Sequence, residues 1–344
     1  MREEHIALAM RMLAIGCFSV GTDQVDISAA ERRGIPVFNA PHASTRSVAE
    51  LTLGCIIALA RRLGDKSAAL HRARWDKSLA GLMKCAAAPW ASSATDISAS
   101  RWVCSPRRSA CACCSTTSSR NSPCLARPVA DLDALLEQAD AVTLHVPETA
   151  RTLGMIGKLQ LARMRRGSYL LNLSRGKVVD AEALRDALAS GHLGGAALDV
   201  YSTEPTPQVA EFDVGFCNLP NVILTPYVGG NTEEAQKNIG LEVAHALTEF
   251  IDRGSTEGAV NFPHVSLPPI PGTHRILHIH KNAPGVLAAV NNIVSEVDAN
   301  IDAQRLATTR DTGYLVMDLN REVCDEVHAR ISALPMNVRT RILY

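Results

Sequence analysis

Apolar runs that stop at polar loops recur through the middle of the chain, between Leu170 and Gln236. Three of them read LLNLSRGKVVD, GGAALDVYSTEP and NVILTPYVGGNTEEAQ. A short, continuous apolar run before a polar loop is typical of a strand buried on both faces, as in parallel sheets. The carboxyl ends of parallel strands meet at one edge, where open α/β folds bind ligands. The pattern therefore predicts an α/β protein with a doubly wound, Rossmann-like parallel sheet.

Residues that could bind a ligand or take part in catalysis follow each of these predicted strands. Arg175 comes after the first, Asp199 and Glu204 after the second, and Tyr227 and then Gly229 and Gly230 after the third. An arginine fixed at a strand end can hold a carboxylate through two parallel hydrogen bonds. A nearby carboxylate could orient a group that transfers protons, for which histidine is best suited near neutral pH. Tyr227 stands where such a histidine would be expected.

The C-terminal part has a different order of elements. After a linker rich in Gly, Ser and Pro, residues 274–344 read strand–helix–strand–strand–helix–strand, which predicts a ferredoxin-like βαββαβ domain. His280 and Asn282 lie at its first strand-to-helix turn and are candidates for a ligand site. The alternative is turn chemistry alone, because the string that starts at Asn282 (NAPG) forms a good turn by itself.

Helix signals are clearest in three places. Apolar residues at helical spacing predict a helix from Thr45 to Leu63, capped by Thr45 or Ser47. Asp180 is the predicted cap of a second helix, and Asn231 or Thr232 that of a third, long one.

Length and charge narrow the class of protein. With 344 residues the chain can form two or three domains. Its formal net charge of zero gives no electrostatic reason to expect nucleic acid or a membrane surface as partner. No apolar run approaches the length of a membrane span, and the N-terminus MREEHIALAMRML is a charged amphipathic segment and not a signal peptide. We therefore expect a cytoplasmic protein.

In combination, these motifs resemble the D-isomer-specific 2-hydroxyacid dehydrogenases. That family reads L-T-P-H-(I/V)-G-G at the third strand, and its histidine is the general acid/base. By resemblance, Arg175 is the family's arginine, Glu204 its histidine-supporting glutamate, and Tyr227 occupies its histidine position. The resemblance also assigns the nicotinamide half of NAD to Leu173, Ser174, Arg175, Asp199, Gly229 and Gly230. The implied reaction is NAD-dependent oxidation of 3-phosphoglycerate to 3-phosphohydroxypyruvate, the first step of L-serine biosynthesis.

The string HKNAPGVL and the terminal RILY resemble the ACT regulatory domain of those dehydrogenases. In them L-serine bridges two ACT domains, which implies a homo-oligomer with serine feedback. The matching effector positions here are His280, Asn282 and Asn300. No metal is implied.

The resemblance also divides the chain. It implies a remnant of the substrate domain at 1–38, completed by 231–262, and an NAD-binding domain at 39–230. A linker at 263–273 and the ACT domain at 274–344 follow. Family members carry several dozen residues before the point that matches Met1, so the chain is expected to begin inside the substrate domain.

One segment breaks the pattern. Residues 82–125 are rich in Ser, Ala and Cys, hold six of the ten cysteines and contain no glycine. A dinucleotide-binding domain needs its G-x-G-x-x-G loop here, because glycine lets backbone amides close on the pyrophosphate. The cysteines could bind a metal or form disulfides, but no histidine or turn pattern accompanies them.

The genetic code suggests a frameshift as the origin of this segment. If each codon's third base is joined to the first two bases of the next codon, the pair Trp90–Ala91 must spell glycine. Continuing with permitted third bases gives GIIGYG, and later VLAEALGMRVLFYDVVE. That reading is a strand, the glycine loop, a helix, a second strand and an acidic residue for the adenine ribose. The alternative is a natural Ser-rich disordered insert.

Two functional hypotheses follow. The first is an active, serine-regulated NAD-dependent dehydrogenase. The second is a catalytically dead or decayed homologue that binds L-serine at most and acts as a regulatory partner. NAD binding distinguishes them.

Overall fold

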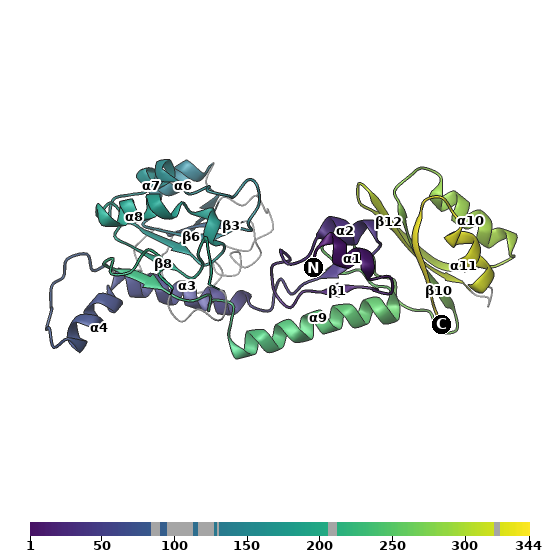
Figure 1. Ribbon diagram of the computed structural model, residues 1–344, viewed down its shortest axis with the longest axis horizontal. Coiled ribbons are helices and arrows are strands. Elements are labelled where there is room, and N and C mark those ends of the chain that lie inside the picture. The colour runs from purple at the N-terminus through teal and green to yellow at the C-terminus, as the bar shows by residue number, and fades with distance from the viewer. Residues whose placement is uncertain (84–89, 95–112, 116–126, 129–130, 206–211, 320–323) are drawn as a thin grey trace. The chain divides into compact units, whose positions relative to one another are not determined.

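The computed structural model describes residues 1–83, 90–94, 113–115, 127–128, 131–205, 212–319 and 324–344. The chain divides into two compact units (Figure 1). One unit is Ser44–Ala235, and the other joins Met1–Ala43 to Gln236–Tyr344. The proposed frameshift and the cysteine-rich string lie mostly outside the described residues.

Unit Ser44–Ala235 is built on a seven-stranded, all-parallel sheet in the order β5-β4-β3-β6-β7-β8-β9. Numbered along the chain, this is 3-2-1-4-5-6-7, which extends the nucleotide-binding order of doubly wound folds. The predicted fold class is therefore confirmed. The strands are β3 (Trp90–Ala94), β4 (Cys113–Ser115), β5 (Arg127–Pro128), β6 (Ala141–His145), β7 (Tyr169–Asn172), β8 (Gly195–Leu198) and β9 (Val222–Leu224).

Helices cover both faces of this sheet (Figure 1). α3 (Thr45–Ala60) packs on one face, and α6 (Leu132–Gln138), α7 (Lys158–Arg163) and α8 (Ala181–Ala189) pack on the other. Successive side chains of β7 enter different cores, Leu170 with α6–α8 and Leu171 with α3. Each fully buried leucine contributes about 1.5–3 kcal/mol, so a strand covered on both faces must be apolar throughout.

The observed helix ends agree in part with the caps and bounds predicted from the sequence. Asp180 accepts hydrogen bonds from the amides of Glu182 and Ala183, and Thr232 accepts one from Ala235, which confirms both caps. The predicted cap of α3 was wrong: Ser44 is the cap residue, without a side-chain cap bond. α3 also ends early, because Arg62 adopts a left-handed conformation before α4 (Leu63–His71). A 3-10 turn, η2 (Gly176–Val178), follows β7.

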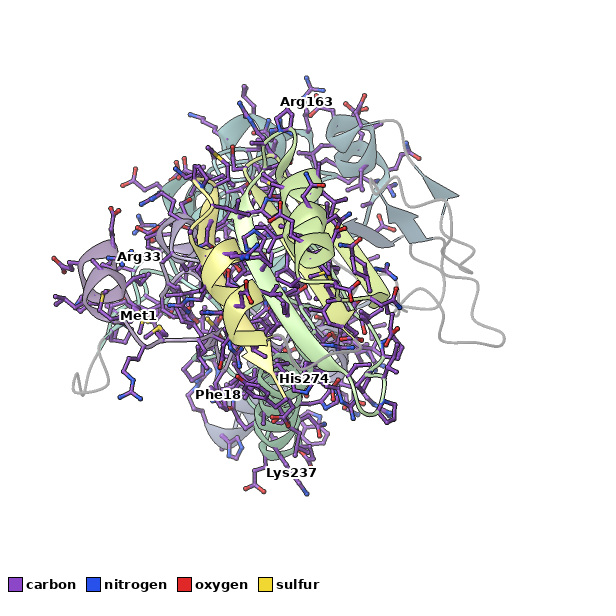
Figure 2. The ribbon with its side chains drawn as sticks, turned by 90° about the vertical axis from the view of Figure 1, so that its right-hand side faces the viewer. Met1, Phe18, Arg33, Arg163, Lys237 and His274 are labelled. Atoms are coloured by element: carbon purple, nitrogen blue, oxygen red, sulfur yellow. The ribbon has the colours of Figure 1, made fainter. Side chains whose placement is uncertain are left out.

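The second unit contains the ferredoxin-like domain, in the predicted order of elements. Its antiparallel sheet has the order β11-β12-β10-β13, and α10 and α11 lie on one face (Figures 1 and 2). His274, labelled in Figure 2, begins β10. The elements are β10 (His274–Lys281), α10 (Val286–Glu296), β11 (Ile301–Thr308), β12 (Thr312–Leu319), α11 (Cys324–Ser332) and β13 (Asn337–Leu343).

The other face of this sheet packs against the N-terminal segment and α9. Leu277 and Tyr314 of the sheet share one core with Phe38 and Phe250, and the Tyr314 hydroxyl donates to the Gly254 carbonyl at 2.6 Å. The small sheet is therefore anchored to this segment. The remaining elements are α1 (Glu3–Leu8), β1 (Ile15–Gly16), α2 (Ile27–Arg32), β2 (Val37–Phe38) and α9 (Glu233–Arg253). None of the helices in the described ranges is long and apolar enough to span a membrane.

Candidate active site

The loop after β7 is shaped by a buried asparagine. Asn172 is 1% exposed; its Nδ2 donates to the Arg175 carbonyl at 2.9 Å, and its Oδ1 accepts from the amide and hydroxyl of Ser174. A Cβ on Gly176 would lie 1.9 Å from the Tyr201 carbonyl oxygen, so only glycine lets this loop pack on the loop after β8. The strand end thus presents Ser174 and Arg175 in a defined turn.

Asp199, at the end of β8, organises the loop after β9. Its Oδ1 accepts from the Thr225 hydroxyl at 2.5 Å and from the Val228 amide at 2.9 Å, and its Oδ2 accepts from the Gly229 amide at 2.8 Å. The Asp199 carbonyl also accepts from the Tyr227 amide at 2.9 Å. Burying a carboxylate costs free energy unless hydrogen-bond donors surround it, and Asp199 is only 3% exposed. The Thr225 hydroxyl and the amides of Val228 and Gly229 are the donors that offset this cost.

The loop held in this way has an unusual backbone. Tyr227 has a φ of +56°, in the left-handed region that few non-glycine residues adopt, and its side chain is half exposed. A Cβ on Gly229 would lie 2.8 Å from Asp199 Oδ2, so that glycine is needed for the carboxylate to reach the amide. Asp199 therefore fixes the direction in which residue 227 points.

The negative charge of Asp199 acts on two neighbours. Burial, reinforced by Asp199, raises the pKa of the Cys55 thiol to about 11. Burial and then Asp199 raise the pKa of Tyr201 to about 12, and the Tyr201 hydroxyl donates to the carbonyls of Leu198 and Thr225. Both groups stay neutral at physiological pH, so Cys55 is not a nucleophile.

The structure brings most of the predicted residues together. Ser174, Arg175, Asp199 and Tyr227 lie on the loops after the adjacent strands β7, β8 and β9, together with Gly229 and Gly230. Leu173 is buried in the core with α3, so only its backbone is available to a ligand. Glu204 is exposed, and within the described part of the chain it has no hydrogen bond or ion pair.

The predicted effector residues do not all meet within one chain. His280 pairs with Gly313 near one end of the sheet. Asn300 precedes Ile301, which aligns with Leu319 and thereby with His274 at the other end. Six residues at about 3.3 Å each separate the two ends by roughly 20 Å. Asn282 stays near His280, and its Nδ2 donates to the Thr309 carbonyl at 2.9 Å.

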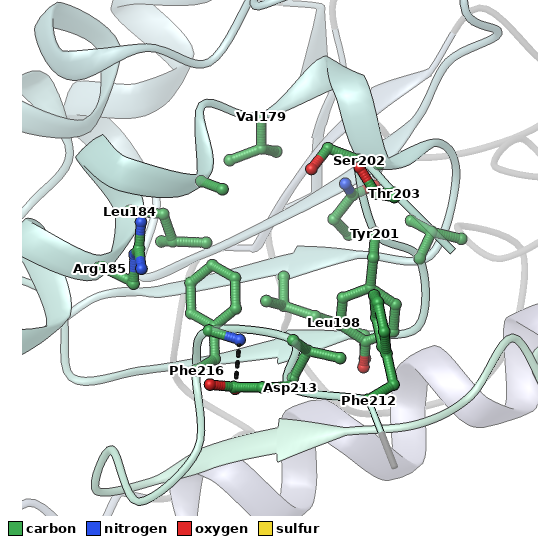
Figure 3. A pocket seen from close by; sticks show the side chains of 16 residues that line it. Val179, Leu184, Arg185, Leu198, Tyr201, Ser202, Thr203, Phe212, Asp213 and Phe216 are labelled. Carbon is green, nitrogen blue, oxygen red and sulfur yellow. Dashed lines mark hydrogen bonds between the residues drawn. The ribbon is translucent and has the colours of Figure 1, made fainter. Parts of the chain in front are cut away.

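A cavity of about 300 Å³ lies beside α8 and the ends of β7 and β8 (Figure 3). Its walls combine apolar side chains, Leu184, Phe212 and Phe216 among them, with polar ones, and Arg185 and Asp213 are its charged residues. No predicted catalytic or cofactor residue lines it. The loops at the sheet edge, and not this cavity, carry the candidate chemistry.

Comparison with known proteins decides the family. The sequence model described as "D-isomer specific 2-hydroxyacid dehydrogenase, NAD binding domain" matches residues 110–229, and that of the "AHAS small subunit-like ACT domain" matches 276–338. D-3-phosphoglycerate dehydrogenase of Dictyostelium discoideum is 44% identical over 343 residues, which cover 99% of this chain and 84% of that protein. The Escherichia coli K12 enzyme of the same name is 43% identical over 349 residues, with the same coverage.

The chain belongs to the D-3-phosphoglycerate dehydrogenase family.

Solved structures agree with this assignment. D-lactate dehydrogenase from Aquifex aeolicus, solved with NAD and lactic acid, has a TM-score of 0.67 at 27% identity and covers 76% of this chain and 84% of that one. The TT0316 protein from Thermus thermophilus has a TM-score of 0.60 at 31% identity and covers 73% and 79%. Membership of the phosphoglycerate dehydrogenase family confirms the predicted family, its NAD-binding domain and its ACT domain.

Two residues that shape the candidate site were not among the predicted site residues. Asn172 donates to the carbonyl of Arg175, and Thr225 donates to the Asp199 carboxylate that holds the loop of Tyr227. Both are polar residues directly after apolar runs, at YLLN and VILT. A polar residue buried at a strand end must find hydrogen bonds, and that signal was available in the sequence.

Replacing Asp199 by asparagine should loosen the loop of residues 225–229. The amide group cannot accept from both backbone N–H groups, so one buried donor loses its partner, at a cost of about 1–3 kcal/mol. We expect faster hydrogen exchange at the amides of Val228 and Gly229. Asp213→Asn, which affects an exposed carboxylate bonded to the Gly215 amide, is the control and should leave this loop unchanged. Unaltered exchange in Asp199→Asn would contradict the positioning role.

Proposed function

We propose that this chain catalyses the reversible NAD-dependent oxidation of 3-phosphoglycerate to 3-phosphohydroxypyruvate, the first step of L-serine biosynthesis. One observation carries the proposal: in a member of this family, the loops that hold Arg175, Asp199 and residue 227 converge at the carboxyl edge of the parallel sheet. The curated relatives named above bear the name of this activity.

Each residue has a role in this proposal. Arg175 binds the carboxylate and the reacting oxygen of the substrate through its guanidinium. Residue 227 takes the hydroxyl proton, with Glu204 as its supporting carboxylate. The residues that would hold the nicotinamide half of NAD are Leu173 (through its backbone), Ser174, Arg175, Asp199, Gly229 and Gly230. When bound, NAD supplies the acceptor for the hydride.

Tyrosine at position 227 limits this chemistry. Phenols lose their proton only near pH ~10, whereas imidazoles do so near pH ~6.5. A phenol also has one titratable atom, so it cannot hold a bond to Glu204 on one side and exchange a proton on the other, as imidazole does. The chain as printed is therefore expected to turn over slowly.

We further propose that the gene encodes the glycine loop in the shifted frame. Two described strands support this proposal. β3 (Trp90–Ala94) coincides with the shifted reading GIIGY, and β4 (Cys113–Ser115) coincides with LFY of the shifted VLFYD. The shifted aspartate then follows β4 directly, where doubly wound folds bind the ribose. Resequencing the gene should reveal one base gained or lost near Gly81 and a compensating change near Ala126; unchanged bases would reject the proposal.

NAD binding tests the cofactor assignment. A variant that carries the shifted reading at 82–125 should bind NAD at least about tenfold more tightly than the printed chain, because its glycine loop lets amides approach the pyrophosphate. Isothermal titration with NAD measures both. Equal affinities would contradict the shifted loop, and failure of the repaired variant to form NADH from 3-phosphoglycerate would contradict the proposed reaction.

For regulation we propose L-serine as effector in a homo-oligomer. Since His280 and Asn282 lie at one end of the ACT sheet and Asn300 at the other, a two-fold related copy could supply Asn300 to the same serine. The segment around α4 supports association, because Leu70, Trp75 and Leu79 are mostly exposed. Light scattering that gives the mass of a single chain would exclude the homo-oligomer.

The proposed domains are the substrate-domain remnant (1–38 with 231–262), the NAD-binding domain (39–230) and the ACT domain (274–344). We place the protein in the cytoplasm. Cys17, Cys55 and Cys217 are free thiols, which suits a reducing compartment. Separate expression of 39–230 should give a folded domain; an unfolded product would argue against this boundary.

A further inference from the structure

Two histidines stack on the helix-covered side of the ACT sheet. His278 and His280 are two residues apart on β10, so their side chains share a face, and their ring centroids are 5.1 Å apart at 26°. Both are almost completely buried. His280 is a proposed effector residue, whereas no role has been given to His278.

A chain of hydrogen bonds fixes the tautomer of His278. The Asn337 Nδ2 donates to the Ser332 carbonyl at 3.1 Å, so its Oδ1 faces Thr340 as an acceptor. The Thr340 hydroxyl has one proton and gives it to that Oδ1 at 2.9 Å. His278 Nδ1, 3.1 Å from the same hydroxyl, must therefore be the donor. His278 is thus the Nδ1–H tautomer, and its Nε2 is enclosed without a hydrogen-bond partner in the described residues.

His280 has the same tautomer for a different reason. Its Nδ1 lies 2.9 Å from the Lys281 carbonyl, which can only accept. In the neutral ring Nε2 is then an acceptor. Burial, and next the electrostatic interaction with His280, lowers the pKa of His278 to about 4, so His278 stays uncharged at physiological pH.

The strands on both sides of His280 are adapted to its ring. A Cβ on Gly313, the partner on β12, would lie 2.1 Å from His280 Cε1, so the ring occupies space that any other residue would fill. In the pairing of β10 with β13, Ile279 aligns with Arg339 but His280 aligns with Asn337, so the register shifts by one residue, as in a β-bulge. Bulges commonly re-aim a side chain next to a site.

We propose that His278 is a positioning residue of the effector site: its ring holds His280 in the orientation in which His280 Nε2 accepts a hydrogen bond from the ligand. The site then selects a ligand group that donates, such as an ammonium or a hydroxyl. Asn282 fits the same ligand class, because its Nδ2 is engaged with Thr309 and its Oδ1 remains an acceptor. This inference rests on the proposed effector function of the ACT domain.

Titration of the full chain with L-serine tests the stacking. His278→Ala removes the ring and should weaken binding roughly three- to tenfold, the range of an aromatic pair. His278→Phe keeps a flat ring and should stay within about twofold of the parent. His328→Gln is the matched control, since His328 bonds the Thr340 carbonyl but does not stack on His280, and it should leave the affinity unchanged. Circular dichroism confirms that each variant is folded.

The outcomes separate the inference from the function on which it rests. Parent-like affinity of His278→Ala, or an equal loss in His278→Phe, would overturn the stacking role. If the parent chain does not bind L-serine, the effector assignment fails, and nitrogen-15 spectra of labelled histidine still decide the positioning role. Those spectra should show the Nδ1–H tautomer for both rings, and loss of this tautomer at His278 in Thr340→Val. An Nε2–H tautomer at either ring would overturn the inference.

Discussion

Replacing Tyr227 by histidine is expected to raise kcat for 3-phosphoglycerate oxidation by about 10²–10⁴-fold, the usual contribution of a general base. The loop needs no rearrangement to accept the new side chain. Asp199 holds the Tyr227 amide and the two amides that follow, and histidine is among the residues that adopt the left-handed conformation more readily. The imidazole would therefore inherit the direction that the loop already imposes.

The measurement is NADH formation from 3-phosphoglycerate at saturating NAD, in variants that carry the shifted reading at 82–125. Tyr227→Phe is the control: it removes the hydroxyl without supplying a base and should not gain activity. The rate of the histidine variant should rise as pH increases through about 6.5, since the base must be neutral to take the proton. A gain below tenfold, or an equal gain in Tyr227→Phe, would remove residue 227 from the proton-transfer role.

Features of the site that depend on local sequence were predictable. The runs that form β7 and β8 are largely apolar because both faces of these strands are covered, and this burial is visible in the sequence as a continuous apolar run. The caps Asp180 and Thr232 were also predictable, because a cap bond spans only two or three residues.

What the sequence could not supply depends on partners distant in the chain. The carboxylate of Asp199 is engaged by residues 26 to 30 positions later, and nothing in its own neighbourhood indicates that. β3 has no hydrophobic period, and its place is defined by its parallel pairing with β4 and β6. The distance between Asn300 and His280 likewise follows from sheet register and not from spacing.

Replacing Asp318 by alanine should lower the free energy of unfolding of the C-terminal unit by about 3–5 kcal/mol, the cost of breaking a buried ion pair. The Asp318 side chain is 1% exposed and that of Arg275 is 6% exposed. Arg275 donates to the two carboxylate oxygens at 2.6 and 2.7 Å. Its other donors reach the carbonyls of Arg253, Leu267 and Pro268, at the end of α9 and in the predicted linker. Without Asp318 a buried guanidinium would keep its charge and lose its counterion.

Urea unfolding, followed by hydrogen exchange of the β10 and β12 amides, measures this loss for the unit that contains the pair. Glu326→Ala is the control, because it breaks the largely exposed pair with Arg330 and should cost less than about 1 kcal/mol. A loss below about 1 kcal/mol in Asp318→Ala would mean that the three carbonyls suffice to balance the charge of Arg275. A loss in the expected range would mean that the Gly-, Ser- and Pro-rich segment, although its composition is that of a flexible linker, is fixed to the ACT sheet by one side chain whose five donors are all used.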